Sequence, residues 1–128
     1  FRSQYGPIFM SASAKAEPKL IFRLQFDPEG RIGRGKIELL AHIKQTGSIS
    51  AGGRAMDMSY RRAWLLVDEM NRLFKEPVVE SQRGGKQGGG AVLTPFGEAL
   101  IAHYHAMEEK ARLALADDIG WIVANLAD

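Results

Sequence analysis

The sequence predicts a mainly α-helical protein with a small β component. Three observations favour this class. Apolar residues recur at helical spacing in several segments, a serine or threonine stands where three of these helices would begin, and a glycine-rich segment lies between two short β-prone runs. With 45% hydrophobic and 25% charged residues, the 128-residue chain has the composition of a globular protein that buries a core.

The first expected element is a β-strand within Lys19–Asp27. Its apolar residues alternate with polar ones, which places them on one face of a half-buried strand: Leu20, Phe22, Leu24 and Phe26. The mixed, small and polar residues before it, 1–17, are expected to form a flexible tail. After the strand, apolar residues at helical spacing predict an amphipathic helix from Gly35 to about Thr46, and Gly47 stands where a helix ends.

Two further helices are expected in close succession. Ser48 is a good N-cap for a short helix that runs to about Met56, and the Gly52-Gly53 pair in it makes sense if another helix crosses at very close range. Ser59 then caps a longer helix, which Pro77 stops. The apolar stripe of this longer helix consists of Ala63, Leu66, Val67, Met70, Leu73 and Phe74.

A hairpin and a final helix complete the chain. The runs 78–81 and 91–93 are predicted strands, joined across the glycine-rich segment Gly84–Gly90. Thr94-Pro95 is a strong helix opening, because threonine caps well and proline suits the first helical position. The final helix is expected to break or kink at Asp117-Asp118 and Gly120.

This order of strand, three helices, hairpin and helix is that of a winged helix-turn-helix with a long C-terminal dimerisation helix. The helix-turn-helix would consist of the short helix 48–56 and the helix that Ser59 caps. Asp57 stands at the turn position that glycine usually occupies, and aspartate is acceptable there because it tolerates a positive φ. We therefore expect a DNA-binding domain at 18–97 and a helical dimerisation segment at 98–128.

Charge is unevenly distributed along the chain. The net charge of +2 conceals a front segment, 31–62, with seven Lys/Arg against two acids, and a rear segment, 98–128, with six acids against two Lys/Arg. A basic front and an acidic rear suit a protein that docks on a polyanion in one orientation, although two ordinary solvated faces would give the same pattern.

Double-stranded DNA is the predicted partner. The longer helix would present its N-terminal turns to base edges in the major groove, while the glycine-rich tip of the hairpin, the wing, would lie along phosphates. Arg61 is the expected base contact and Lys86 the expected phosphate contact. The full set of candidate DNA-binding residues is Arg54, Ser59, Tyr60, Arg61, Arg62, Trp64, Leu65, Arg83, Gly85, Lys86 and Gly88.

The last helix is the expected dimer element. Its apolar stripe is long for a helix that covers one small domain, so a second copy would bury the remainder, and a dimer would read a palindrome. A helix folded back on its own core is the alternative. The candidate interface residues are Phe96, Leu100, Tyr104, Met107, Ala111 and Ile122.

Other functional classes find little support in the sequence. The chain has no cysteine, which removes disulfides and thiolate sites and fits a reducing cytoplasm. No apolar run approaches the length of a membrane span. No nucleophile–base–acid set stands out, so no catalytic residue, metal or cofactor is expected; His105 and Glu109 could hold a metal weakly, but a surface pair is more common.

Several motifs resemble the DNA-binding half of the ModE-type molybdate-responsive regulators over about residues 19–105. The motifs are Gly47-Ser-Ile-Ser50, Met58-Ser-Tyr-Arg-Arg-Ala-Trp64, Glu69-Met-Asn71 and Gly84-Gly-Lys-Gln-Gly-Gly-Gly-Ala-Val-Leu-Thr94. The general LysR-like pattern shares the first motif and the Leu-Thr-Pro-Phe-Gly entry to the last helix, but not the Gly-Gly-Lys wing.

The resemblance implies transcriptional control by a dimer on DNA. It places Ser59, Tyr60 and Arg61 at the start of the recognition helix and Lys86 in the wing. Full-length members carry a second, molybdate-binding region, for which this chain is expected to have no room, so molybdate sensing is not implied. Two rivals stay open: a protein-interaction module with vestigial DNA affinity, and a small-ligand sensor near His103, Tyr104 and Trp121.

Overall fold

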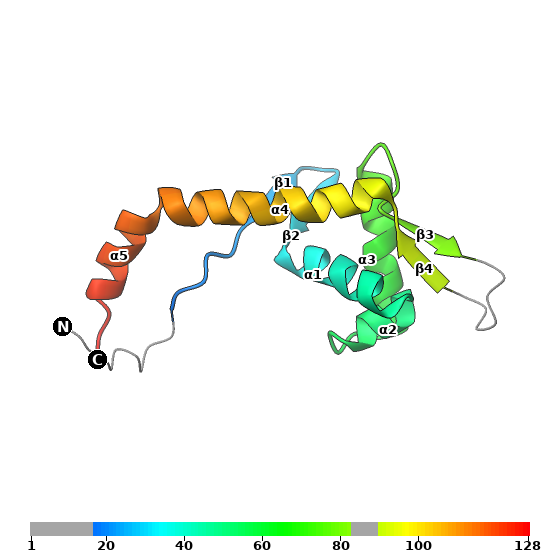
Figure 1. The fold of residues 1–128 in the computed structure, drawn as a ribbon, viewed down its shortest axis with the longest axis horizontal. Coiled ribbons are helices and arrows are strands. Elements are labelled where there is room, and N and C mark those ends of the chain that lie inside the picture. The colour runs from blue at the N-terminus through cyan, green and yellow to red at the C-terminus, as the bar shows by residue number, and fades with distance from the viewer. Residues whose placement is uncertain (1–16, 83–89) are drawn as a thin grey trace. The chain divides into compact units, whose positions relative to one another are not determined.

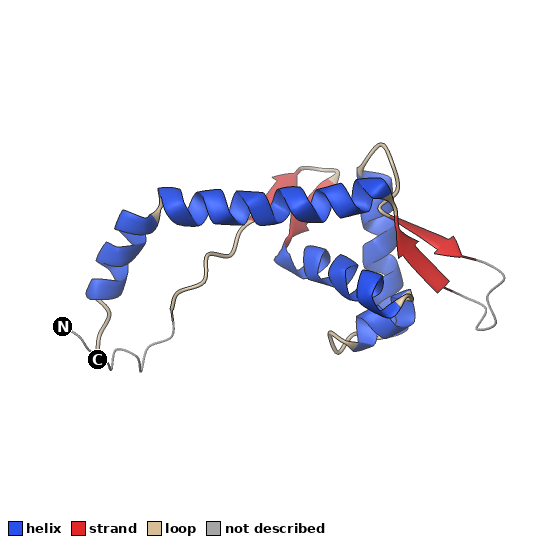
Figure 2. Ribbon diagram, viewed as in Figure 1, coloured by secondary structure: helices blue, strands red, loops and turns tan. Residues whose placement is uncertain are grey.

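The computed structural model describes residues 17–82 and 90–128. It is mainly helical with two small antiparallel sheets, as the sequence predicts (Figures 1 and 2). Contacts divide the chain into a larger unit, Ile21–Ala106, and a smaller one that contains Met107–Asp128. The larger unit extends past the boundary expected at residue 97, because Leu100, Ile101 and Tyr104 still pack against its core.

The N-terminal part of the larger unit is a β-hairpin rather than a single half-buried strand. Strand β1 (Arg23–Phe26) pairs antiparallel with β2 (Gly30–Gly33), a strand that the sequence analysis missed. Every residue of β1 is exposed, so the alternation at Leu24 and Phe26 does not mark a buried face. The buried side chain of the hairpin is Ile32 in β2. Because this four-residue strand begins and ends with glycine, its sequence shows no alternation of apolar and polar side chains.

Helices α1 (Arg34–Thr46) and α2 (Ile49–Arg54) begin and end close to their expected positions. Gly47 ends α1 with φ of 83°, the left-handed conformation that glycine adopts without strain, and its N–H donates to the carbonyl of Ile43 at 2.8 Å. The carbonyl of Gly47 accepts a hydrogen bond from the N–H of Ala91 at 2.9 Å, which ties the second hairpin to the end of α1.

Helix α3 (Tyr60–Leu73) ends before the predicted stop at Pro77. Phe74 is its C-cap in an extended conformation, so this residue leaves the helical stripe and packs against Phe96 with ring centroids 5.3 Å apart. Strands β3 (Val79–Gln82) and β4 (Gly90–Leu93) then pair antiparallel in the predicted hairpin. Figure 2 shows the two sheets in red, separate from one another.

The final helical region contains α4 (Pro95–Ala114) and α5 (Ala116–Ala124). Thr94 caps α4 as predicted, since its Oγ1 accepts from the N–H of Gly97 at 2.9 Å. The break lies at Leu115, not at Asp117-Asp118 or Gly120. The two aspartates instead occupy the first turn of α5, where carboxylates interact favourably with the positive end of the helix dipole.

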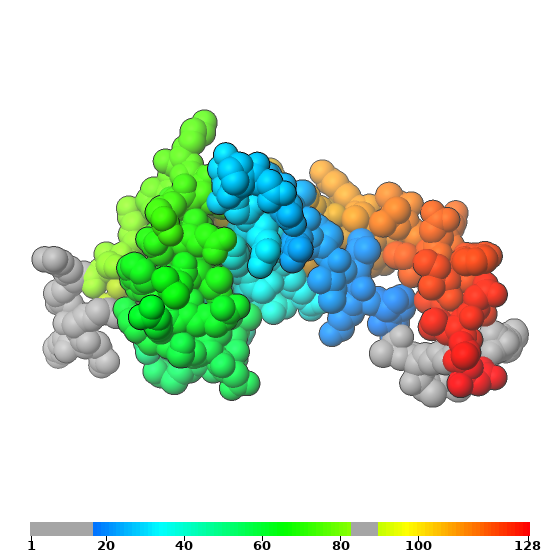
Figure 3. All heavy atoms as spheres, turned by 180° about the vertical axis from the view of Figure 1, so that it is seen from behind, coloured from blue at the N-terminus to red at the C-terminus, as the bar shows by residue number. Residues whose placement is uncertain are grey.

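One hydrophobic core holds the larger unit together. Helix α1 contributes four of its residues, more than any other element, and the rest come from β2, α3, β4, α4, and β3 with the residue before it: Ile32, Ile37, Leu39, Leu40, Ile43, Ala63, Val67, Met70, Val78, Val79, Ala91 and Tyr104. In the space-filling view, α3 and the β1–β2 hairpin lie side by side on one face (Figure 3). Across residues 17–82 and 90–128, no helix has the length and apolar character needed to cross a membrane.

Candidate nucleic-acid interface

The turn between α2 and α3 is held tightly by backbone geometry. Asp57 has φ of 57°, so aspartate does occupy the left-handed position that the sequence predicts. The carbonyl of Gly53 accepts hydrogen bonds from the N–H groups of Met56 and Met58, both at 2.9 Å. This turn therefore fixes where α3 starts.

The glycine pair in α2 lets two helices approach at once. A Cβ atom added at Gly52 would lie 2.7 Å from Cγ1 of Ile43, and one added at Gly53 would lie 2.7 Å from Cβ of Ala63. Real Cβ atoms do not tolerate such distances, so α2 can pack on α1 and α3 in this way only with glycine at both positions. The expected close crossing is confirmed.

The first turn of α3 is capped and basic. The Oγ of Ser59 accepts a hydrogen bond from the N–H of Arg62 at 3.1 Å, which is the predicted N-cap. The first turn contains no acidic residue, and both Arg61 and Arg62 are exposed. The end of α3 that the sequence analysis assigned to DNA thus carries two exposed positive charges at the positive end of the helix dipole.

The predicted DNA-contacting residues that the structure describes are all exposed: Arg54, Ser59, Tyr60, Arg61, Arg62, Trp64 and Leu65. They lie on α2 and on the first two turns of α3, away from the buried stripe of Ala63, Val67 and Met70. Nη1 of Arg54 donates to Oγ of Ser50 at 2.8 Å, which holds the guanidinium beside α2. The fold therefore brings the helix part of the predicted set onto neighbouring elements.

The wing part of the predicted set lies outside the described residues. Arg83, Gly85, Lys86 and Gly88 all fall within 83–89. The strands on either side are described, and their register places Gln82 opposite Gly90. The hairpin that would carry the wing is present, while the contacts of its tip stay a prediction.

Lys36 and Glu69 anchor α3, and the sequence analysis did not single out either as a functional residue. Nζ of Lys36 lies 2.7 Å from Oε2 of Glu69 and also donates to the carbonyl of Arg31 at 2.8 Å. The Lys36 side chain is 10% exposed, so solvent screens this pair less than a surface pair. The ion pair joins α1 and α3 and so limits rotation of α3 about its axis.

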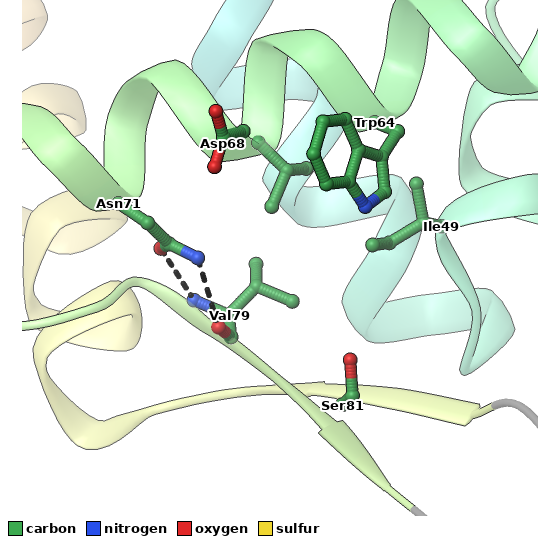
Figure 4. Close-up of a pocket in the computed structure, with 7 residues that line it drawn as sticks. Ile49, Trp64, Asp68, Asn71, Val79 and Ser81 are labelled. Atoms are coloured by element: carbon green, nitrogen blue, oxygen red, sulfur yellow. Dashed lines mark hydrogen bonds between the residues drawn. The ribbon is translucent and has the colours of Figure 1, made fainter.

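Asn71 connects α3 to the base of the β3–β4 hairpin. Its Oδ1 accepts from the N–H groups of Val78 at 2.7 Å and Val79 at 3.3 Å, and its Nδ2 donates to the carbonyl of Val79 at 3.2 Å (Figure 4). Two of these bonds are the paired interactions drawn in Figure 4. One amide therefore fixes the position of the hairpin relative to α3, a role that helical periodicity cannot reveal.

A small hollow of about 90 Å³ lies between α2, α3 and β3. Trp64 of α3 and Ile49 of α2 lie beside one another at one end of it, and Ser81 of β3 lies at the other (Figure 4). Trp64 contributes to the wall of this hollow and still exposes part of its indole, while its contact with DNA stays a prediction.

The predicted dimer residues divide into two groups. Phe96 and Leu100 are partly buried against the core of their own chain, and Tyr104 is buried in it, so the described contacts of these three residues lie within the larger unit. Met107 and Ile122 are exposed, and Ala111 is partly exposed. A dimer surface therefore has to be sought in the smaller unit.

The rival sensor site loses one of its residues for the same reason. The Tyr104 hydroxyl donates to the carbonyl of Phe22 at 2.8 Å, and its ring stacks on that of Phe22 with centroids 4.9 Å apart. A tyrosine engaged in this way closes the core beneath α4 and does not present its hydroxyl to a ligand.

The metal reading of Glu109 is also weakened. Its carboxylate lies 2.7 Å from Nη2 of Arg112, and the hydrogen bond from Arg112 lowers the pKa of Glu109. Within the described ranges, no group of three or more metal-ligating side chains is arranged to hold an ion. Glu109 and Arg112 form an ordinary exposed ion pair at i, i+3.

The chain is similar to ModE regulators and to molybdenum-pterin-binding proteins. It is 41% identical over 112 residues to the DNA-binding transcriptional dual regulator ModE of Escherichia coli (strain K12). The aligned region covers 85% of this chain and 40% of that relative. The chain is 55% identical over 78 residues to the molybdenum-pterin-binding protein MopB of Rhodobacter capsulatus, which covers 61% of this chain and 29% of that protein.

The match to MopA of Rhodobacter capsulatus is 39% identical over 101 residues, or 77% of this chain and 38% of MopA. No protein-family model matches the chain. The chain spans well under half the length of the curated relatives that it matches. Over the region that they share, its homologues are the ModE regulators and the MopA and MopB proteins, and this similarity supports the ModE family.

Proposed function

We propose that this chain binds double-stranded DNA sequence-specifically as part of a transcriptional regulator of the ModE type. In this proposal α2 and α3 form the helix-turn-helix of a winged-helix domain, and the β3–β4 hairpin carries the wing. The chain binds a palindromic operator as a dimer and has no catalytic activity. It acts in the cytoplasm.

The basic, capped and exposed start of α3 supports this function most strongly. A recognition helix needs one side of its N-terminal turns free of the core and positively charged, and it must be held rigidly by the rest of the domain. In the first turn of α3, Arg61 and Arg62 are exposed, while Ala63 packs into the core. Rigid support comes from the Gly53 turn, the Lys36–Glu69 ion pair and the Asn71 clamp.

In the proposal, the wing extends the same surface, since the described base of its hairpin is tied to the helices. Asn71 and the bond between Ala91 and Gly47 hold the hairpin base against α3 and α1. In the proposal, Arg83 and Lys86 lie along the phosphates of the duplex beside α3, and the glycines at 85 and 88 let the backbone come close to them.

The dimer surface in this proposal is the smaller unit. Trp121 is 70% exposed and Ile122 is 56% exposed, and four further large apolar side chains of this unit are exposed too: Met107, Leu113, Leu115 and Leu126. An apolar surface of this kind is unfavourable in water and is commonly covered by a second copy. Two copies would present two α3 helices to successive half-sites.

A selection experiment tests the proposal. The purified chain is used to enrich duplexes from a random DNA pool, and fluorescence anisotropy then compares the enriched duplex with a scrambled one at two salt concentrations. We expect selective, salt-sensitive binding. If no duplex is enriched, or if binding is equal on both duplexes, the proposed function is wrong.

Arg61→Ala should weaken binding to the enriched duplex by about 1–3 kcal/mol and relax base choice. Arg72→Ala is the matched control, since Arg72 lies near the end of the same helix in an ion pair with Asp68 at 3.1 Å. An equal loss on the enriched and the scrambled duplex for Arg61→Ala would instead make Arg61 a phosphate contact, and an Arg61→Ala chain that binds like Arg72→Ala would contradict any DNA contact at Arg61.

A second candidate follows from the similarity to MopA and MopB, whose names describe molybdenum-pterin binding. The chain would then take part in recognition of a molybdenum-containing ligand. Adding molybdate to the anisotropy titration separates the two: a shift of the binding curve would support an oxyanion site in this chain, and an unchanged curve would leave DNA binding without a molybdate response.

A further inference from the structure

We propose that the exposed Leu65 side chain, on the outward face of α3, is a subsite for the C5-methyl group of thymine in the major groove. This inference rests on the proposed function, because it requires that α3 enters the groove. It goes further by naming the base chemistry that the second turn of the helix recognises.

Helical geometry places Leu65 at the centre of the outward face of α3. The buried residues Ala63, Val67 and Met70 mark the side of the helix that faces the core. At about 100° per residue, Arg61 and Leu65 lie on the opposite side, one helical turn apart. Leu65 is 47% exposed and is not among the residues that pack against the core, so its apolar surface is available to a partner.

Leu65 is the large apolar side chain on this outward face. Its neighbours one helical turn away are charged: Arg61 and Arg62 before it, and Asp68 and Glu69 after it. Trp64 is 45% exposed but lies on another side of α3, at the hollow between α2 and β3.

The charges around Leu65 favour a polyanionic partner. Arg54, Arg61 and Arg62 are all exposed and lie on α2 and the first turn of α3. The first acidic residue of α3 is Asp68, whose carboxylate is paired with Arg72 at 3.1 Å. A surface for an acidic protein could also be basic, but DNA combines a dense negative charge with apolar groups at a fixed depth in the major groove.

Thymine supplies those apolar groups. Its C5-methyl projects into the major groove, where side chains of suitable size contact it, whereas cytosine, adenine and guanine present only donors and acceptors there. With Arg61 directed at a guanine edge or a phosphate, the base one helical turn further along α3 meets Leu65. We therefore expect thymine at this position of each half-site.

Replacement of thymine by uracil is the sharpest test, because dU keeps every hydrogen-bonding group of dT and lacks only the methyl group. In the enriched duplex each dT is replaced by dU in turn, and anisotropy gives the ratio of the two dissociation constants at each position. For the unchanged chain we expect a loss of about fourfold at one or more positions, which corresponds to the burial of one methyl group.

The variants assign the methyl contact to its side chain. For Leu65→Ala the ratio should fall to about one at the same position, while Leu65→Met should keep most of the effect. Arg72→Ala, on the same helix, should leave the ratio unchanged. Circular dichroism checks that each variant is folded, which we expect because both Leu65 and Arg72 are exposed.

The outcomes separate this inference from the proposed function. If no duplex is enriched, both are wrong. If a duplex is enriched but dU binds as well as dT at every position, or if Leu65→Ala keeps the full ratio, α3 does not read the methyl through Leu65 and this inference alone is wrong. If Leu65→Ala leaves DNA affinity unchanged altogether, Leu65 is not part of the DNA surface and this inference is again wrong.

Discussion

The two units of this chain use their apolar residues in opposite ways. In the larger unit, the apolar positions of α1 are almost entirely buried, as are Ala63, Val67 and Met70 in α3. In the smaller unit no residue of α5 is buried, and Trp121 is among its most exposed side chains. Both sequences are amphipathic or apolar at helical spacing, so periodicity alone does not distinguish them.

The same helical pattern of apolar residues can therefore be buried within one chain or be left exposed for a partner. In the larger unit, helices and hairpins from the same chain cover the stripe, and the fold is complete within residues 21–106. In the smaller unit, the described part of the chain leaves the stripe uncovered. We propose that a second copy covers it, so that the stability of the smaller unit should depend on protein concentration, whereas that of the larger unit should not.

The largest expected effect contrasts one apolar residue from each unit. Leu40→Ala removes a fully buried side chain and should lower the free energy of unfolding by about 2–5 kcal/mol at every protein concentration. Ile122→Ala should have little effect in dilute solution but should lower the concentration dependence of the melting temperature. Thermal unfolding over a range of concentrations measures both, and an Ile122→Ala chain that behaves like the unchanged one at all concentrations would contradict the dimer surface.

The next effect contrasts two glycines. A Cβ atom at Gly97 would collide with the backbone carbonyl of Val78, so Gly97→Ala should cost about 1–3 kcal/mol. A Cβ atom at Gly120 in α5 would meet nothing within 4 Å, so Gly120→Ala should stabilise its helix by about 1 kcal/mol. Urea unfolding gives both values, and a destabilising Gly120→Ala would show that α5 is tightly covered in solution.

The smallest effect concerns helix starts. Helices α2, α3 and α4 each begin at a side-chain cap, whereas α5 begins at Leu115 without one. Ser48→Ala should cost about 1 kcal/mol through loss of the bond from the N–H of Ala51. Ser50→Ala, two residues further along, is the matched control and should change stability by less than about 0.5 kcal/mol. Similar losses for the two variants would show that the cap does not hold α2.

Local chemistry was the part of the fold that the sequence predicted best. Ser48, Ser59 and Thr94 cap the helices that they were expected to cap, Gly47 ends α1, and Asp57 takes a positive φ. Each of these outcomes depends on a few neighbouring residues, so the sequence contains the necessary information. The break in the final helix was misplaced, because Asp117 and Asp118 suit the first turn of a helix as well as a break.

Contacts between distant residues were predicted poorly. Strand β2 was missed because its pairing with β1 depends on the tertiary fold, and α3 was drawn too long because Phe74 turns away to meet Phe96. Two residues that support the candidate site bond to partners that helical periodicity does not connect. Lys36 pairs with Glu69, 33 positions away, and Asn71 bonds to the backbone 7 and 8 positions further along the chain. Tyr104 was assigned to a dimer surface because a helical stripe does not reveal which partner covers it.

Amide hydrogen exchange with and without the enriched duplex tests the contrast between the two units most directly. The account predicts that DNA slows exchange in α2 and the first turns of α3, residues 48–65, and leaves the larger part of residues 107–128 unchanged. Protection confined to residues 107–128, or tight binding without any protection in α3, would contradict the assignment of DNA recognition to α3.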